Sequence, residues 1–202
     1  MTPLFRRIPP RFLALILTSL IAGLATEALA APKTPTTSSM TLFEFSGAAN
    51  ETAWISVNDG VMGGVSRGGA KLIAGSLHFN GVLSLENNGG FSSIRSGGPT
   101  RDLSIANTIV LRVKGDGRIY RLQLATNAEF RRSRISYQAE FPTKQGEWSE
   151  VAVPLAGLVP MYRGQTLSGP PLDRTKIAEI GLSLADGNPG PFALEVDWIR
   201  AE

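Results

Sequence analysis

The sequence predicts an all-β domain that begins near residue 40. Apolar and polar residues alternate with a period of two in many short runs, and no stretch after residue 40 keeps a helical period for more than about two turns. Short strands at intervals of about ten residues are typical of a β-sandwich or a β-barrel. The clearest expected strands span 76–85, 90–95, 108–114, 118–126, 134–141, 149–154, 176–185 and 192–199.

Two of these strands carry long hydrogen-bonding side chains at alternate positions. Arg121 and Gln123 alternate with apolar residues in one strand, and Arg134 and Gln138 do the same in another. Alternate residues of a strand lie on opposite faces of a sheet. We therefore expect the apolar faces to form the core, and these four polar side chains to lie on an outer, concave face that binds a ligand or partner.

A glycine-rich segment, 54–66, predicts a tight, folded corner. It contains three glycines and the pair Asn58-Asp59, residue types that enter turns and adopt positive φ. The polar side chains are expected to cap backbone amides and the glycines to allow close packing. The alternative is a surface that docks a partner, with Asp59 and Met62 as contacts, since methionine adapts readily to apolar surfaces.

A second glycine-rich segment, 83–95, predicts a β-hairpin. Apolar and polar residues alternate on both sides of Asn88-Gly89, and this dipeptide is typical of two-residue hairpin turns. We expect its two arms to pair with each other.

These two corners resemble the complex I intermediate-associated protein 30 family. Further blocks of the resemblance occur in order at 42–45, 111–120, 138–141, 146–148, 180–182 and 190–199, so that it covers nearly all of residues 41–201. It implies a galactose-binding-like jelly-roll β-sandwich over residues 40–202. It also implies a non-catalytic role, because the mitochondrial members are assembly factors of respiratory complex I.

The first thirty residues have the pattern of an export signal. Basic residues up to Arg11 precede an uncharged, mostly apolar run, and Ala28-Leu29-Ala30 supplies the small residues that signal peptidase accepts. The apolar run is shorter than the roughly 18 to 20 residues that span a bilayer, which disfavours a retained anchor. We expect residues 1–30 to be a cleaved signal peptide, 31–39 a flexible tether, and the mature protein to be periplasmic.

Charge and composition exclude several classes of protein. The net charge is +3, and removal of residues 1–30 leaves +1, because three basic residues and one acidic residue lie in that segment. No strongly basic face is expected, so nucleic acid is not an expected partner. The chain has no cysteine and one histidine, which excludes a thiol nucleophile and leaves too few ligands for catalytic zinc or iron.

Other motifs for catalysis or metal binding are weak. Residues 64–68 match the pattern Gly-x-Ser-x-Gly, but that elbow needs a strand-to-helix turn and a histidine late in the chain. The single histidine, His78, lies early and inside an expected strand. We therefore expect no enzyme and no cofactor. A structural calcium ion stays open, with carboxylate ligands drawn from Asp59, Glu86, Asp116, Asp186 and Asp197.

Two further features bear on the expected surface. Trp54, Trp148 and Trp198 are expected in the core, and the alternative is a platform on which sugars stack. Residues 159–172 contain several prolines, which predicts the longest loop and a candidate rim for a binding surface.

Together these expectations describe an exported, monomeric, non-catalytic module. It would assist assembly of a membrane protein complex, of the respiratory complex I kind, by binding a protein partner at the membrane or envelope. The alternative is a periplasmic carbohydrate-binding module.

The leader is open to a direct test. N-terminal sequencing of the protein from the exported fraction is expected to start at Ala31, because signal peptidase cleaves after Ala-x-Ala. A mature protein that still starts at Met1 would contradict the expected export with cleavage.

Overall fold

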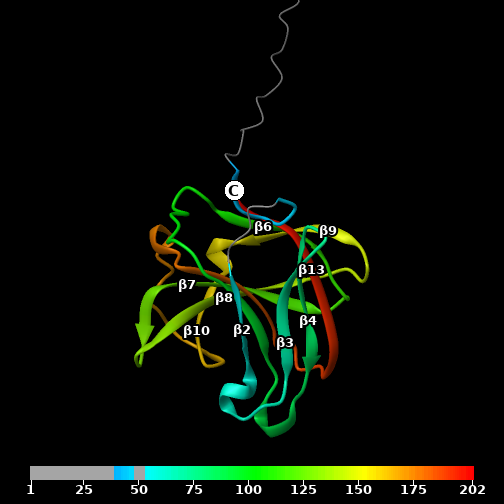
Figure 1. Cartoon of the computed structure of the whole chain (residues 1–202). Helices are drawn as coiled ribbons and strands as arrows, with labels where there is room; N and C mark the ends of the chain where they lie inside the picture. The colour runs from blue at the N-terminus through cyan, green and yellow to red at the C-terminus, as the bar shows by residue number, and fades with distance from the viewer. Residues whose placement is uncertain (1–38, 48–52) are drawn as a thin grey trace, which may run out of the picture. The chain divides into compact units, whose positions relative to one another are not determined.

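The computed structural model describes residues 39–47 and 53–202. Over these residues the chain forms two antiparallel β-sheets that enclose one hydrophobic core (Figure 1). The all-β jelly-roll sandwich expected from the sequence is confirmed. The expected signal peptide lies outside the described residues, as does the expected tether except for Ser39.

Within the described residues, the first sheet has six strands in the order β3-β4-β13-β6-β9, with β1 also paired to β13. All its pairings are antiparallel. Its strands are β1 (Met40–Glu44), β3 (Arg67–Ile73), β4 (Ser76–Leu83), β6 (Thr108–Lys114), β9 (Trp148–Pro154) and β13 (Gly190–Ala201).

The second sheet has seven strands in the described part of the chain, in the order β11-β10-β8-β7-β12-β5-β2. Its outer face carries the cleft described below. Its strands are β2 (Trp54–Asn58), β5 (Ser92–Ser96), β7 (Ile119–Phe130), β8 (Ser133–Pro142), β10 (Val159–Tyr162), β11 (Gln165–Thr166) and β12 (Glu179–Leu184).

Short 3₁₀ helices complete the fold. They are η1 (Asp59–Met62), η2 (Glu86–Asn88), η3 (Leu155–Gly157) and η4 (Arg174–Lys176). Within residues 39–47 and 53–202, no helix has the length and apolar character needed to cross a membrane.

The core forms because the strands alternate as the sequence predicts. Leu122 and Leu124 of β7 are completely buried, whereas Arg121 and Gln123, which alternate with them, remain partly exposed on the outer face. In β8, Tyr137 is buried and its hydroxyl donates hydrogen bonds to the carbonyls of Pro170 and Pro171, at 3.1 and 3.3 Å. This contact fixes part of the proline-rich segment to the seven-stranded sheet.

The final strand, β13, pairs with three others. Its first half, up to Val196, pairs with β4, its end pairs with β1, and β6 lies along its other side. The register shifts between Val196 and Trp198. Met40 is paired with Ala201, so the first described strand and the end of the chain lie side by side.

The hairpin expected over residues 83–95 is wrong. Strand β4 belongs to the six-stranded sheet and β5 to the seven-stranded sheet, so this segment crosses between them. Asn87 and Asn88 both have positive φ, 54° and 58°, and Gly90 follows at 126°. These turns direct the chain across the edge of the sandwich instead of back along β4.

The prediction of a loop over residues 159–172 is also partly wrong. It contains the short strands β10 and β11, and β10 pairs with β8. Pro160 lacks an N–H, but its carbonyl still accepts a hydrogen bond from Leu167 N–H at 2.9 Å. A short strand therefore tolerates the proline.

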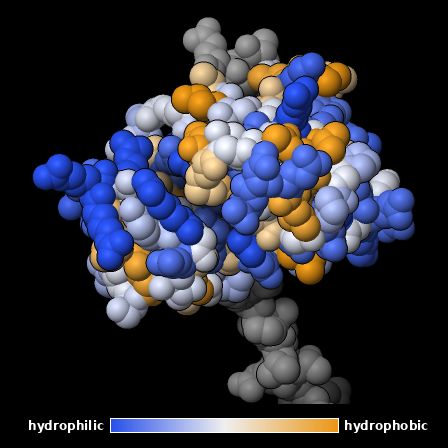
Figure 2. Space-filling model, turned by 90° about the horizontal axis from the view of Figure 1, so that it is seen from below, coloured by the Kyte–Doolittle hydropathy of each residue, from blue (hydrophilic) through white to orange (hydrophobic). Residues whose placement is uncertain are grey.

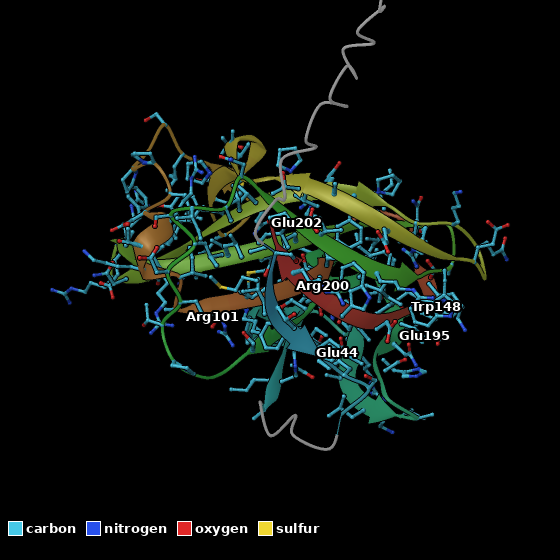
Figure 3. All side chains as sticks on the ribbon, turned by 90° about the horizontal axis from the view of Figure 1, so that it is seen from above. Glu44, Arg101, Trp148, Glu195, Arg200 and Glu202 are labelled. Atoms are coloured by element: carbon cyan, nitrogen blue, oxygen red, sulfur yellow. The ribbon has the colours of Figure 1, made fainter. Side chains whose placement is uncertain are left out.

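The three tryptophans have different environments. Trp198 is buried and Trp54 packs against the core half-buried, but Trp148 is 38% exposed, which corrects the expectation of a core residue. Trp148 begins the edge strand β9, and the Lys114 ammonium lies 5.5 Å from the centre of its ring. Lys114 also pairs with Glu195 at 2.8 Å, at the same end of the sheet (Figure 3).

A close approach between β3 and β4 should not tolerate a side chain at Gly81. A Cβ there would lie 2.0 Å from the Arg67 carbonyl oxygen and 2.8 Å from Cε1 of Phe192. Gly81→Ala is expected to lower the free energy of unfolding by about 1–3 kcal/mol, measured by denaturant titration. Gly157→Ala is the control, because a Cβ there meets nothing within 4 Å. Equal midpoints for the two variants would contradict this reading of the β3–β4 contact.

Candidate binding cleft

A cleft of about 600 Å³ crosses the outer face of the seven-stranded sheet. Five of the six residues that the sequence predicts for a binding surface line it: Met62, Arg121, Gln123, Arg134 and Gln138. The η1 corner and the segment after η2 form one wall, and β10 forms the opposite wall.

The strand register explains how these side chains come together. One row of paired residues runs across six strands, from Ile55 through Arg95, Gly181, Gln123 and Gln138 to Val159. Residues paired across a sheet share a face, so this row lies on the outer side. At Gly181 the row has no side chain, and a Cβ there would lie 3.4 Å from Cγ of Arg95 and 3.6 Å from Oε1 of Gln123. These two side chains therefore converge above the glycine.

The ion pairs of the described cleft arginines differ in closeness. Glu179 lies between two arginines, 3.7 Å from Arg95 Nη1 and 4.0 Å from Arg134 Nη1. Both distances exceed the length of a hydrogen bond. Arg121 is held more firmly, because its Nε and Nη2 donate to Glu140 Oε1 at 3.1 and 2.9 Å.

Two glutamine side chains on the floor are oriented by serines. Gln123 Nε2 donates to Ser183 Oγ at 2.8 Å, and Gln138 Nε2 donates to Ser136 Oγ at 3.2 Å. Each side-chain amide then has its oxygen as a hydrogen-bond acceptor on the floor of the cleft. The floor therefore presents hydrogen-bond donors and acceptors whose side chains are oriented by contacts with neighbouring residues.

Apolar side chains stand at both ends of the cleft. At the η1 end, Val61 is 75% exposed and Met62 57% exposed. At the β10 end are Met161 and Tyr162. Figure 2 shows this side of the molecule from below, where hydrophobic residues are gathered beside long hydrophilic side chains.

The sixth predicted residue, Asp59, does not line the cleft. Its side chain is completely buried in the corner, where it accepts hydrogen bonds from both sides. The Ser66 hydroxyl and amide donate at 2.5 and 2.9 Å, and the amides of Gly90 and Phe91 donate at 2.7 and 3.3 Å. Asp59 thus joins η1 to the segment that enters β5, and it positions the wall that carries Met62.

The glycines around Asp59 make room for its carboxylate. A Cβ at Gly64 would lie 2.4 Å from Cγ of Asp59, and one at Gly89 would lie 2.6 Å from Oδ2. Gly63 and Gly90 instead have positive φ, 94° and 126°. The expectation that this corner caps amides and packs closely is confirmed, although the carboxylate acts between two loops and not within one.

The pKa of Asp59 reflects the same contacts. Burial raises the pKa of this carboxyl, but hydrogen bonds from Ser66, Gly90 and Phe91 outweigh burial and hold the pKa below its ordinary value. Its charged form therefore stabilises the fold at neutral pH.

The serine of the Gly-x-Ser-x-Gly pattern is part of this network. Ser66 is 5% exposed; its hydroxyl donates to Asp59 and accepts from the Ser84 amide at 2.9 Å. His78 lies in β4, paired with Lys71 and Glu195 in the six-stranded sheet. Ser66 and His78 are therefore in different settings, as expected for a chance match to the pattern.

Four of the five carboxylates considered for calcium, Asp59, Asp116, Asp186 and Asp197, are engaged by protein donors, and Glu86 is exposed. Asp116 accepts from the Tyr120 hydroxyl, Asp186 pairs with Arg118, and Asp197 pairs with Arg112. Among the described residues, no group of three or more histidine, cysteine, aspartate or glutamate side chains is arranged to hold a metal ion.

Arg95, Glu179, Gly181 and Ser183 are cleft or floor residues that the sequence did not single out. Arg95 alternates with buried Ile94 in a segment predicted as a strand, so the same alternation that identified Arg121 was present. The sequence does not show the order of the strands in the sheet. Only the order β5-β12-β7-β8 shows that these residues and Gln123 share one floor.

The fold is a two-sheet β-sandwich with a cleft on the outer face of one sheet. The sequence profile described as Complex I intermediate-associated protein 30 (CIA30) matches residues 43–196. The chain therefore belongs to the CIA30 family. The mouse mitochondrial Complex I intermediate-associated protein 30 is 37% identical over 102 residues, which span 48% of this chain and 31% of the mouse protein.

Solved structures share the fold at low sequence identity. A family 11 carbohydrate-binding module from Clostridium thermocellum, in complex with a β-1,3-1,4-mixed-linked tetrasaccharide, aligns with a TM-score of 0.62 and 19% identity over 81% of this chain and 94% of that module. A family 30 carbohydrate-binding module aligns with a TM-score of 0.51 and 15% identity, over 81% of this chain and 87% of that one. These similarities establish the sandwich fold.

Replacing the Asp59 carboxylate should destabilise the protein in a pH-dependent way. Asp59→Asn is expected to lower the free energy of unfolding by about 1.5–3 kcal/mol at pH 7, because charged hydrogen bonds are lost. A depressed native pKa adds stability above the unfolded value of about 3.9, and this stability disappears as pH falls through the native pKa. The gap between variant and wild type should therefore close below pH of about 4, in urea titrations at several pH values.

The control for this test is Glu86→Gln, which removes an exposed carboxylate from the same corner. Its stability is expected to stay within about 0.5 kcal/mol of wild type. A gap for Asp59→Asn that does not change with pH would show that the carboxylate charge is not what holds the two loops.

Proposed function

We propose that this protein is a non-catalytic binding module that assists assembly of a membrane protein complex by holding a protein partner in the cleft. One observation carries the proposal: Arg121, Gln123, Arg134 and Gln138 converge on a single cleft that ends in exposed apolar side chains. Polar groups give such a site orientation, and apolar contacts give it affinity.

Family membership supports a role in assembly. The mouse relative is named as a complex I intermediate-associated protein, and this chain matches it over part of its length. We propose by extension that the partner belongs to a membrane complex of the respiratory complex I kind. The leader pattern of residues 1–30 supports an encounter on the exported, periplasmic side of the membrane, and we propose that the mature protein acts there as a monomer.

The cleft favours binding over catalysis. Of the described residues that line it, Glu179 alone is a carboxylate, and histidine is not among them. Glycoside hydrolysis typically needs two carboxyl groups on either side of the scissile bond. General acid–base chemistry needs a group whose pKa lies near the working pH. The lining offers arginines, amides and hydroxyls, which bind and orient.

Aromatic rings near the cleft favour a protein partner over a sugar. Sugars bind by stacking on exposed ring faces, but the Arg163 guanidinium lies 5.4 Å over the Tyr162 ring, and Phe130 meets that ring edge-on at 5.1 Å. The apolar rim at Val61 and Met62 instead offers flexible aliphatic contacts.

A carbohydrate ligand is the second candidate. The row of amides and hydroxyls on the floor, Gln123, Gln138 and Ser183, has the chemistry that hydrogen-bonds sugar hydroxyls. The family 11 module with the same fold was solved with a mixed-linked tetrasaccharide. Mixed-linked glucan is therefore the probe for this alternative.

A photo-crosslinking amino acid in the cleft wall tests the proposal in cells. Placed at Met62, it is expected to give a discrete protein adduct, because Met62 is 57% exposed beside the cleft. Placed at Leu72, which is 48% exposed on β3 of the other sheet, it should not give that adduct. Mass spectrometry of the Met62 adduct is expected to identify a subunit of a membrane complex.

The double variant Arg121→Ala/Arg134→Ala should reduce the Met62 adduct at least about fivefold while stability stays within about 1 kcal/mol. The matched control is Arg112→Ala/Arg200→Ala, two similarly exposed arginines on the outer face of the six-stranded sheet. Equal adducts at Met62 and Leu72, or binding of mixed-linked glucan that the cleft variant abolishes, would overturn the proposal.

A further inference from the structure

We propose that the cleft selects an extended acidic segment of a protein, with acidic residues over its centre and an apolar residue at each end. This inference rests on the proposed function and specifies the partner's chemistry. It follows from three features of the cleft: its excess of positive charge, its direction across the strands, and its apolar ends.

Arginines outnumber carboxylates in the lining, with Arg121 paired to Glu140 at 2.9 Å beside it. Of the described residues that line the cleft, four are arginines, Arg95, Arg121, Arg134 and Arg163, and one is acidic, Glu179. A concave surface lined by one sign of charge attracts the opposite sign. Carboxylates are the matching groups on a protein partner, because a guanidinium binds them in a two-pronged geometry.

The central arginines retain much of their binding capacity. Glu179 lies 3.7 Å from Arg95 and 4.0 Å from Arg134, too far for hydrogen bonds, so one carboxylate is shared loosely by two guanidiniums. Nε of Arg95 is buried without a hydrogen-bond partner among the described residues. The two guanidiniums carry two positive charges, and Glu179 carries one negative charge. A second carboxylate between them would neutralise the remaining positive charge.

The direction of the cleft determines which groups of a bound segment it can recognise. Besides the η1 corner and the loops, the lining residues come from β2, β5, β12, β7, β8 and β10, which are neighbours in this order. With strands about 4.8 Å apart, the cleft is about 24 Å long, which matches an extended segment of about seven residues at about 3.3 Å each. A segment that crosses the strands cannot extend the sheet by edge pairing, so its side chains carry the recognition.

The two ends of the cleft set the pattern of the segment. Val61 and Met62 stand at the η1 end, and Met161 and Tyr162 stand at the β10 end. Arg95, Arg121, Arg134 and Glu179 occupy the strands between them, and Arg163 follows β10 beside Tyr162. An apolar, acidic, apolar order of side chains therefore matches the cleft along its length. An acidic polysaccharide would satisfy the arginines but leave both apolar ends uncovered, which is why we favour a protein segment.

Fluorescence anisotropy with a defined probe tests this inference. The probe is a labelled heptapeptide with leucine at both ends, serine next to each leucine and three glutamates in the centre. Two matched peptides carry three glutamines or three lysines instead. The glutamate peptide is expected to bind at least about tenfold more tightly than the glutamine peptide and to weaken as salt rises, because exposed charges are screened beyond about 8 Å at 0.15 M salt.

A gain-of-affinity variant guards against misfolding as an explanation. Glu179→Gln removes the carboxylate that competes for Arg95 and Arg134, and it should tighten binding of the glutamate peptide about three- to tenfold. Glu150→Gln, which changes an exposed carboxylate on β9 of the other sheet, should leave binding unchanged. Arg134→Ala should weaken binding, since its side chain is 59% exposed and its loss does not open the core.

The outcomes separate this inference from the proposed function. Equal binding of the glutamate and glutamine peptides, or an unchanged or weaker affinity in Glu179→Gln, would overturn the acidic segment. The Met62 adduct in cells would then still support a protein partner of other chemistry. Polygalacturonate is the probe for the alternative ligand. If it binds more tightly than the glutamate peptide, and Arg134→Ala abolishes that binding, the acidic protein segment is overturned and the arginines serve an acidic polysaccharide.

Discussion

The Asp59 carboxylate is the contact on which the cleft depends. It is completely buried, yet four backbone or hydroxyl donors from two separate segments satisfy it. Because buried charge without such partners would be costly, the two segments must stay together for the fold to hold. One of them carries Met62, and the other leads into β5 and Arg95. The apolar wall and the charged floor are therefore positioned by the same buried group.

Much of the fold could be predicted from local alternation, because one face of each sheet is buried. The strand expected over residues 108–114 is found as Thr108–Lys114, and the inner and outer faces of β7 are as expected. Prediction failed where the chain leaves a sheet. Residues 83–95 have the local pattern of a hairpin, but the contacts of Asp59 with Gly90 and Phe91 direct this segment to the opposite sheet. Such long-range contacts have no local signature.

The candidate site was predictable to a similar extent. Arg121, Gln123, Arg134 and Gln138 could be assigned to an outer face because each alternates with buried apolar residues. Arg95 and Glu179 were not recognised, since their strands come from distant parts of the sequence and become neighbours of β7 only in the sheet. The residue type of Asp59 is compatible with a partner contact, but a carboxylate that binds a partner must be exposed, and Asp59 is buried. Exposure is a property of the tertiary structure.

The pairing of Met40 with Ala201 has a consequence for how this domain can be displayed. Both ends of the described domain lie at one pole of the sandwich, and η1 lies at the other (Figure 1). A domain attached to a surface or fused to another protein through either end would direct the Met62 corner outward. The C-terminal residue is itself part of the fold, since Glu202 exchanges backbone hydrogen bonds with Thr108 at 2.9 Å. Deletion of Glu202 would remove these hydrogen bonds from the start of β6.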